Sequence, residues 1–217
     1  MIVGLFVAIA SNLKLLDLIG SKMTNILEIP FDQQMVRRAY EKSLALGSIN
    51  NSILKGKGNT AGYLGEEAVA AYIQAVIMSS DEGSDKYNHD LIVDNHKYKK
   101  IEVKTKRRKY DPRPDWQVSI AKTSKHQNPD LYIFTSITFG RHIGEGRDRI
   151  YYEPKSIWIT GQMQPKEYFA KARLCQKGKP DPDRRGRTND FETHVEMYNM
   201  NIEDLEPLDV SLLPQKQ

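Results

Sequence analysis

Three side chains near the middle of the chain have the types and spacing that phosphate chemistry requires. Asp90 precedes Glu102 by twelve residues, and Lys104 follows Glu102 with one residue between them. Because side chains alternate between the two faces of a β-strand, Glu102 and Lys104 share one face of a strand at 101–106. A short turn from a strand at 89–94 would bring Asp90 beside them. The pattern predicts two carboxylates and an ammonium group at one point of a sheet.

Two adjacent carboxylates repel each other at neutral pH, and a hard divalent cation removes that repulsion. Mg²⁺ prefers oxygen ligands, usually one or two carboxylates together with water and phosphate. Such an ion polarises a phosphodiester and lowers the pKa of bound water. Lys104 would orient the attacking water, help to deprotonate it, or stabilise charge that develops on the phosphate. The sequence therefore predicts a Mg²⁺ site at Asp90 and Glu102, at which Mn²⁺ would substitute.

Basic residues surround these carboxylates, since eight of the residues at 97–109 are Lys or Arg. They would hold a polyanion, and Lys106, Arg107 and Arg108 are the candidates for contacting a DNA backbone. The other interpretation is a solvated edge strand whose lysines discourage aggregation. That interpretation explains several of the lysines, but it explains less well why a carboxylate and a lysine share a face beside a second carboxylate.

This combination resembles the PD-(D/E)XK nuclease superfamily, which has the restriction-endonuclease-like fold, and phage-type members in particular. In that pattern an Asp begins one strand and (D/E)-X-K lies in the next, as Asp90 and the E-V-K at 102–104 do here. The Pro of the pattern is absent, because His89 precedes Asp90. The resemblance covers residues 62 to 137. It implies a metal-dependent nuclease that hydrolyses DNA by in-line attack of water on phosphorus, without a covalent intermediate.

The resemblance also implies two further catalytic residues. Many members place a Glu on the first core helix, and Glu66 in "GYLGEEAV" matches that position, with Glu67 as the neighbouring alternative. Glu66 would be a third metal ligand, directly or through water. The other interpretation of Glu66 is the ordinary preference of acidic side chains for the first turn of a helix. Several members place a Gln on the strand after the lysine, which makes Gln117 a candidate accessory residue.

The expected order of elements is helical at first, then a series of strands, then a C-terminal part with both helix and strand. This order predicts an α/β sheet with helices packed against it. The resemblance implies a restriction-endonuclease-like mixed β-sheet core flanked by helices, with extra N-terminal helices and a C-terminal extension. We expect an N-terminal helical segment at 1–55, the nuclease core at 56–165, and an extension packed on the core at 166–217. Helices are expected at 31–54, 60–78 and 165–174. Strands are expected at 89–94, 101–106, 116–121, 130–139 and 149–161.

Composition narrows the class of protein. A net charge of +4 over 217 residues permits a nucleic-acid partner without requiring one. A single cysteine, Cys175, excludes an internal disulfide and fits a reducing compartment. The five histidines show no zinc-like spacing, which argues against a zinc site or an HNH-type nuclease. We expect a cytoplasmic location, in the host cytoplasm if the chain is viral.

The first twenty residues form the most apolar stretch of the chain. No positive charge precedes them, as a signal peptide would require, and Asn12, Lys14 and Asp17 interrupt a membrane span. We therefore expect a buried or homodimer-forming segment and no membrane attachment. Met23 is a second candidate for the start of translation.

Two more segments offer nucleic-acid contacts. The sequence "KGKPDPDRRGR" at 177–187 is a candidate DNA-contacting loop through Arg184, Arg185 and Arg187, although charge runs are commonly just solvated loops. Tyr110 and Trp116 are candidates for stacking on an unpaired base, and Trp116 is equally a candidate for the core.

Two other functions stay open from the sequence. A non-catalytic DNA-binding module of the same fold would share the basic surface. A dimeric structure-selective endonuclease, such as a junction resolvase, would keep the chemistry and use two active sites for two symmetric cuts. The sequence does not distinguish endonuclease from exonuclease action, or DNA from RNA.

Overall fold

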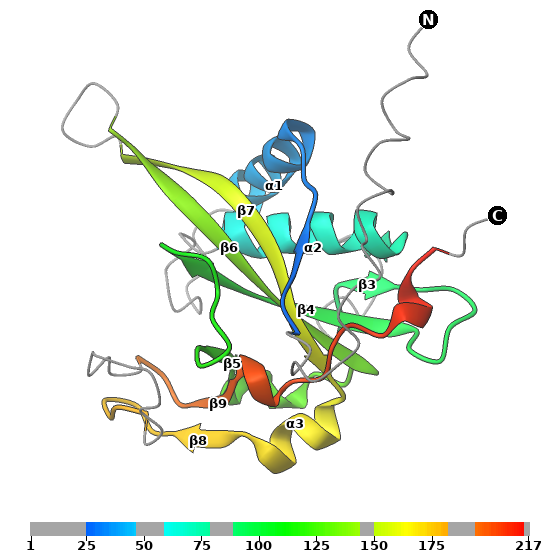
Figure 1. The fold of residues 1–217 in the computed structure, drawn as a ribbon, viewed down its shortest axis with the longest axis vertical. Coiled ribbons are helices and arrows are strands. Elements are labelled where there is room, and N and C mark those ends of the chain that lie inside the picture. The colour runs from blue at the N-terminus through cyan, green and yellow to red at the C-terminus, as the bar shows by residue number, and fades with distance from the viewer. Residues whose placement is uncertain (1–24, 47–58, 79–88, 144–149, 182–193, 215–217) are drawn as a thin grey trace, which may run out of the picture.

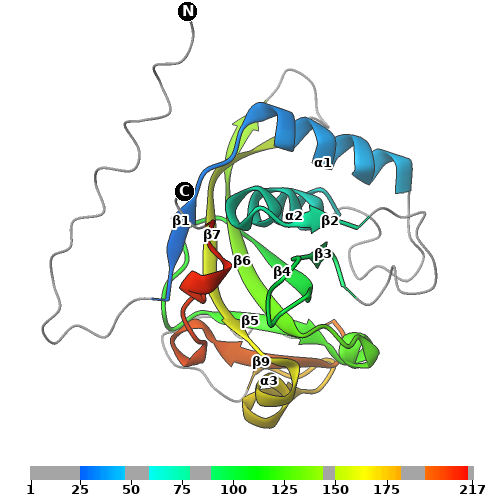
Figure 2. The same ribbon diagram turned by 90° about the vertical axis from the view of Figure 1, so that its right-hand side faces the viewer.

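The structure is a computed structural model that describes residues 25–46, 59–78, 89–143, 150–181 and 194–214. Within these residues the chain forms two β-sheets, three α-helices and a few short 3₁₀ helices. Helices cover one face of the larger sheet, and the smaller sheet lies across its other face (Figures 1 and 2). The described chain is therefore an α/β structure with a mixed sheet, as the order of expected elements indicates.

The larger sheet has six strands in the order β1-β7-β6-β4-β3-β2. Only β4 and β6 run parallel, while the other neighbours are antiparallel. The long strands β6 and β7 continue past the others as a two-stranded arm (upper left in Figure 1). The strands are β1 (Leu27–Ile29), β2 (Val76–Ile77), β3 (Leu91–Ile92), β4 (Lys100–Arg108), β6 (Leu131–Ile143) and β7 (Ile150–Met163).

Two helices, α1 (Gln33–Leu46) and α2 (Asn59–Ile73), lie on one face of this sheet. The side chain of Asp32 accepts a hydrogen bond from the Met35 N–H at 2.8 Å and so satisfies one free donor at the start of α1. A hydrophobic core fills the space between the helices and the sheet. Its fully buried members include Leu64, Ala68, Val69, Leu91, Ile101, Leu131, Ile133, Ile137, Ile157 and Ile159.

Helix α2 approaches β4 closely at one glycine. A Cβ atom on Gly65 would collide with the hydroxyl of Thr105, whereas nothing lies within 4 Å of the corresponding position at Gly62. Thr105 points to the helical side of β4, so Glu102 and Lys104 point to the other side. The absence of a side chain at Gly65 allows α2 to lie close to β4, and it brings the next residue, Glu66, toward the strand that carries Glu102 and Lys104.

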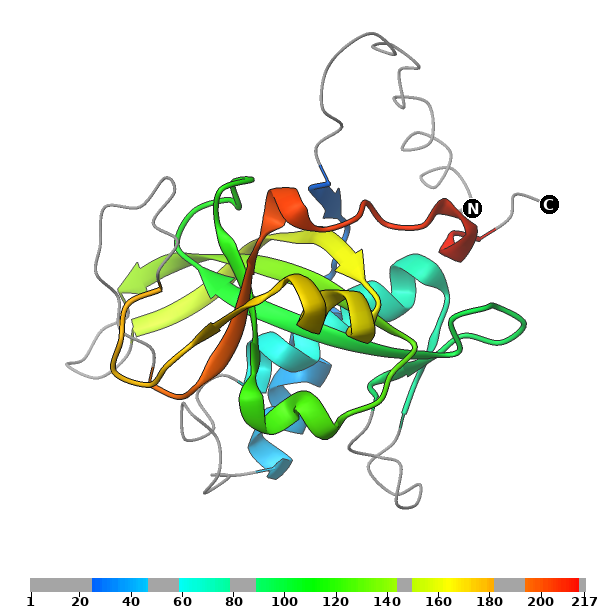
Figure 3. The same cartoon turned by 90° about the horizontal axis from the view of Figure 1, so that it is seen from below.

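The smaller sheet has the order β5-β9-β8, and the helix α3 (Pro165–Lys171) packs beside it (Figure 3). Its strands are β5 (Gln117–Ala121), β8 (Arg173–Cys175) and β9 (Met197–Asn201). A second hydrophobic core joins this sheet to the larger one. It contains Val118, Ile120, Tyr132, Phe134, Met163, Tyr168, Met200, Ile202 and Leu205.

Several elements differ from the expectation. The region expected to be helical at 1–55 also supplies β1, which pairs with β7. The helix expected at 60–78 ends at Ile73, and Val76–Ile77 form β2 instead. The expected C-terminal extension supplies β8 and β9, and β9 pairs with β5 from the expected core. β1 and β8 have three residues each, which is too few to show an alternating pattern in the sequence. Because β9 pairs with β5, the boundary at residue 165 does not separate two packing units.

No helix in the described part of the chain is both long enough and apolar enough to cross a membrane. The apolar segment at 1–20 and Met23 lie outside the described residues.

Candidate active site

The β3–β4 pairing brings Asp90 to Glu102. Leu91 pairs with Ile101 in antiparallel register, and the Asp90 N–H donates to the Ile101 carbonyl at 2.9 Å. One step further along the ladder, Asp90 lies opposite Glu102, as the predicted hairpin requires. The Asp90 Oδ2 atom accepts a hydrogen bond from the Val103 N–H at 2.8 Å, which fixes the carboxylate at the start of β3.

Glu102 is 4% exposed, and its two oxygens have different surroundings. Its Oε1 atom accepts hydrogen bonds from Lys104 Nζ at 2.6 Å and from Gln127 Nε2 at 3.0 Å. Lys104 Nζ also donates to Gln127 Oε1 at 2.9 Å, which closes a ring of three side chains. The Oε2 atom of Glu102 is buried and has no hydrogen-bond partner among the residues that the structure describes. A desolvated carboxylate oxygen without a donor is costly unless a cation or water meets it.

Glu66 on α2 belongs to the same electrostatic group. Burial raises the pKa of Glu66 to about 7, and the negative charges of Glu102 and Glu67 add to the increase, while Lys42 and Lys104 oppose it. Glu67 points elsewhere, because its carboxylate binds Arg38 Nη2 at 2.7 Å and ties α2 to α1. Of the two candidate glutamates, Glu66 is therefore the one available to the site.

The negative charges of neighbouring carboxylates also act on Asp90. Burial raises the pKa of Asp90 well above its ordinary value, and the charges of Glu66 and Glu102 raise it further. Lys104 and the hydrogen bond from the Val103 N–H act in the opposite direction. Three carboxylates therefore influence one another across α2, β3 and β4, and positive charge nearby would stabilise their ionised forms.

Sequence reasoning missed three side chains around this group. Gln127 follows the short 3₁₀ helix at Lys122–His126 and holds both Glu102 and Lys104. Lys42 on α1 lies over the ring of Tyr63, with its Nζ 5.3 Å from the ring centroid, and its charge favours ionised Glu66. Burial and the charges of Glu66 and Asp90 raise the pKa of Tyr63. No sequence pattern marks these residues, because their positions depend on packing between distant elements.

The donor set fits a hard divalent cation. Among the described residues, no group of three His, Cys, Asp or Glu side chains is arranged to hold a metal ion on its own. Mg²⁺ does not need three, because one or two carboxylates with water and substrate phosphate are its usual ligands. Glu102 offers a buried oxygen that no described residue meets with a hydrogen bond, and Asp90 lies opposite Glu102 directly before β3. These two residues are the ones that would hold the ion.

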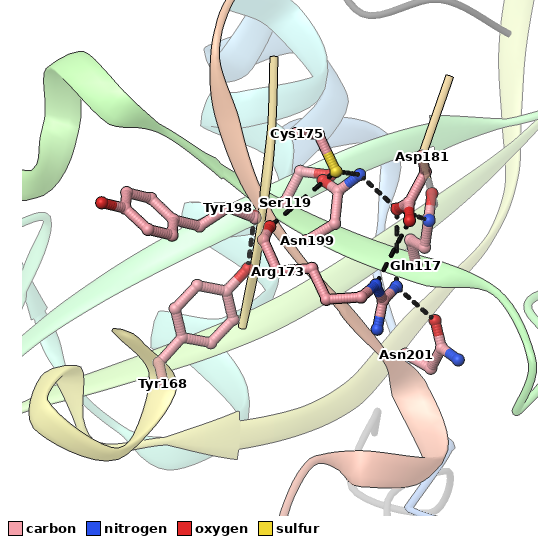
Figure 4. A network of polar contacts seen from close by, with 9 residues as sticks. All are labelled: Gln117, Ser119, Tyr168, Arg173, Cys175, Asp181, Tyr198, Asn199 and Asn201. Carbon is pink, nitrogen blue, oxygen red and sulfur yellow. Dashed lines mark hydrogen bonds and ion pairs between the residues drawn. The ribbon is translucent and has the colours of Figure 1, made fainter. Parts of the chain in front are cut away.

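Gln117 is not part of this group. Its strand, β5, pairs with β9 in the smaller sheet, and its Nε2 donates to Asp181 Oδ2 (Figure 4). Asp181 also accepts hydrogen bonds from Asn199 Nδ2 at 2.7 Å and from Arg173 Nε at 3.2 Å. The expectation that Gln117 accompanies Lys104 therefore finds no contact in the structure. Gln127, ten residues later, occupies that place instead.

The basic residues at the end of β4 differ in exposure. Arg107 is exposed, with its guanidinium carbon 4.7 Å from the centroid of the Phe139 ring. Lys106 and Arg108 are half-buried, and Arg108 lies on the same face of β4 as Glu102 and Lys104. The second set of expected DNA contacts, Arg184, Arg185 and Arg187, lies outside the described residues.

Comparison with known proteins assigns no family. No protein-family model, curated protein or solved structure matches this chain.

Proposed function

We propose that this protein is a metal-dependent nuclease that hydrolyses DNA phosphodiester bonds, with Asp90, Glu102 and Lys104 as the central residues. The observation that carries the proposal is the asymmetry of Glu102. One of its oxygens is held by Lys104 and Gln127, and the other is buried, next to a second carboxylate, with no hydrogen-bond partner in the described part of the chain. A purely structural ion pair does not require that arrangement, since both oxygens would then gain from hydrogen bonds.

The order of elements supports the PD-(D/E)XK interpretation of the fold. A helix with Glu66 precedes a strand that Asp90 begins, and the next strand carries Glu102 and Lys104. This is the order implied by the resemblance, and the strands are paired as it requires. We therefore propose a restriction-endonuclease-like core made of α2 and β2–β4 with β6.

Each residue has a distinct role in the proposed reaction. Asp90 and Glu102 would hold Mg²⁺ or Mn²⁺, with Glu66 as a further ligand, directly or through water. When bound, the ion would polarise the phosphodiester and acidify a water molecule. The side chain of Lys104 is 20% exposed, so its ammonium group is held by Glu102 and Gln127 yet reaches solvent. Lys104 would orient the attacking water and stabilise charge on the phosphate oxygens.

The first test is cleavage of plasmid and single-stranded DNA with Mg²⁺ or with EDTA. Lys104→Ala and Asp90→Asn should each lower the Mg²⁺-dependent rate by about 10²-fold or more, because each removes a group that acts on the reacting phosphate. Folding, measured by circular dichroism, and DNA binding in EDTA should stay close to wild type.

Matched controls come from the turn between β3 and β4. Lys99 and Asp94 are exposed there, so Lys99→Ala and Asp94→Asn should keep full activity. Wild-type cleavage rates in Lys104→Ala or Asp90→Asn would contradict the proposal. Stable DNA binding by a wild-type protein that never cleaves would instead identify a non-catalytic binding module.

A further inference from the structure

The end of β4 and the loop after it place two cations next to two aromatic rings. We call Arg108, Lys109, Tyr110 and Trp116 the β4-end cluster. The guanidinium carbon of Arg108 lies 4.7 Å from the centroid of the Trp116 ring, and Lys109 Nζ lies 5.3 Å from that of Tyr110. Cations next to aromatic faces are the elements from which single-strand binding surfaces are built.

Arg108 is the charged centre of this cluster, and its described partners are neutral. Its Nε donates to Ser136 Oγ at 2.9 Å, and its Nη2 donates to the Gln117 carbonyl at 2.7 Å. Burial lowers the pKa of Arg108 to about 10. The positive charge of a half-buried cation is not neutralised by neutral acceptors, so a bound anion would interact with it favourably.

Tyr110 provides an open aromatic surface beside that charge. It is 63% exposed and lies two residues beyond Arg108, where β4 ends. Lys109 Nζ lies close to the ring of Tyr110. The phosphate of a base stacked on Tyr110 would therefore lie near the ammonium group of Lys109. Trp116 is less open, because its side chain is half-buried, and Arg108 lies over its ring.

The cluster is connected to the candidate active site by one strand. Glu102, Lys104 and Arg108 alternate onto the same face of β4. At a rise of about 3.3 Å per residue, Lys104 and Arg108 are roughly 13 Å apart along the strand. A nucleic-acid strand whose phosphate sits at Glu102 and Lys104 could therefore continue along β4 to the cluster.

We propose that the β4-end cluster is a subsite for single-stranded DNA, in which Tyr110 stacks on an unpaired base while Arg108 and Lys109 bind the adjacent phosphates. This inference rests on the proposed nuclease function and deepens it by naming an unpaired strand as the substrate. A base held in a duplex is already stacked on its neighbours, so it has no free face to offer Tyr110.

The test is binding in EDTA, where cleavage plays no part. The probes are a fluorescent oligo-dT of about 15 nucleotides, an abasic strand of equal length, and the matching dT·dA duplex. Tyr110→Ala should weaken oligo-dT binding at least about fivefold, because one stacked base contributes about that much or more. The same variant should leave abasic and duplex binding unchanged, and Tyr110→Phe should bind like wild type.

Two controls make the result specific. Tyr40→Ala removes a similarly exposed tyrosine (55%) on α1 and should change nothing. Lys109→Ala should weaken oligo-dT and abasic binding alike, because it removes a phosphate contact. Equal oligo-dT binding by wild type and Tyr110→Ala, or no single-strand binding by wild type, would overturn the subsite. Loss of cleavage in Lys104→Ala tests the nuclease separately, so either proposal can fail while the other stands.

Discussion

Glu102 sits among neighbours that neutralise only one of its two oxygens. Lys104 and Gln127 both meet Oε1, and Gln127 bridges the two charged side chains at hydrogen-bond distance. An amide suits this position because it donates to the carboxylate and accepts from the ammonium group at once. Gln127 is therefore a positioning residue that fixes Lys104 relative to Glu102.

Loss of that bridge should affect catalysis more than binding. Gln127→Ala should lower kcat about 10–100-fold, the usual effect of removing a residue that orients a ligand, and should leave KM for DNA nearly unchanged. Steady-state kinetics with a fluorescent substrate measure both. Asn128→Ala, at the exposed neighbouring position, is the control. An unchanged kcat in Gln127→Ala would show that Lys104 does not depend on the bridge.

The carboxylates themselves predict a pH dependence of stability. Folding raises the pKa of Glu66 to about 7 and that of Asp90 well above its ordinary value. In the unfolded chain both titrate near pH 4. The folded state therefore binds more protons than the unfolded state between these values. Stability without a divalent cation should be greatest below about pH 4 for these groups, and should fall as pH rises through the folded pKa values.

Removing one of these charges should relieve the repulsion. In EDTA at pH 8, Asp90→Asn should raise Tm by roughly 2–4 °C, which corresponds to about 1 kcal/mol for a chain of this size. The amide oxygen can still accept from the Val103 N–H, so the local structure is kept. At pH 4 the gain should vanish, because Asp90 is then protonated in the wild type. A lower Tm at pH 8 would show that the repulsion is already compensated.

At the scale of elements, helix α2 and strand β4 position the site through one close contact. Gly65 faces Thr105 without room for a methyl group, and the Thr105 hydroxyl accepts from Thr135 Oγ1 at 2.8 Å. Any side chain at Gly65 would push α2 away from the sheet and carry Glu66 with it.

Two glycines on the same helix give a matched pair of variants. Gly65→Ala should destabilise the protein by about 1–3 kcal/mol through overpacking. Gly62→Ala meets open space and should stabilise it by about 0.5–1 kcal/mol, because alanine favours the helix. Denaturant titration measures both free energies of unfolding. Equal effects of the two substitutions would contradict the close contact with Thr105.

The smaller sheet is held by a buried polar network (Figure 4). Asp181 is 4% exposed and joins β5, β8 and β9 through Gln117, Arg173 and Asn199. A guanidinium and two amides donate to it, so both of its oxygens have partners, whereas among the described residues only Oε1 of Glu102 has them. This contrast separates an ion pair that stabilises a sheet from a carboxylate suited to binding a cation.

At the scale of the whole molecule, the larger sheet lies between two cores of different construction. The helical core covers one face, and the smaller sheet covers part of the other. Glu102, Lys104 and Arg108 lie on that second face, on β4 beside the strand that carries Tyr132 and Phe134. The net charge of the chain is only +4, but four basic residues follow one another at 106–109, and local charge matters more for DNA binding than the total.

DNA binding should accordingly weaken with salt, and one arginine should change the slope. Arg107→Ala should reduce the slope of log K against log[salt] by about 0.7–0.9, the value for one phosphate contact. Fluorescence anisotropy in EDTA at several salt concentrations measures it. Arg37→Ala, an exposed arginine on α1 paired with Glu41, should leave the slope unchanged. Identical slopes for wild type and Arg107→Ala would place the DNA away from the end of β4.

The sequence by itself determined the α/β class, the main helices and long strands, and the alignment of Asp90 with Glu102 and Lys104. These features follow from local rules, because strand alternation and a short hairpin fix which side chains share a face. The candidate Glu66 also came from the sequence, while the choice between Glu66 and Glu67 came from the contact of Glu67 with Arg38.

Only the tertiary structure decided the partners of those residues. The sequence predicted Gln117 as the accessory residue and did not mark Gln127, yet β5 pairs with β9, so Gln117 binds Asp181 while Gln127 reaches Lys104. The short strands β1, β8 and β9 were likewise not predicted from the sequence, because their pairing joins segments far apart in the chain. Local periodicity carries no information about such pairings, which depend on how two cores pack across one sheet.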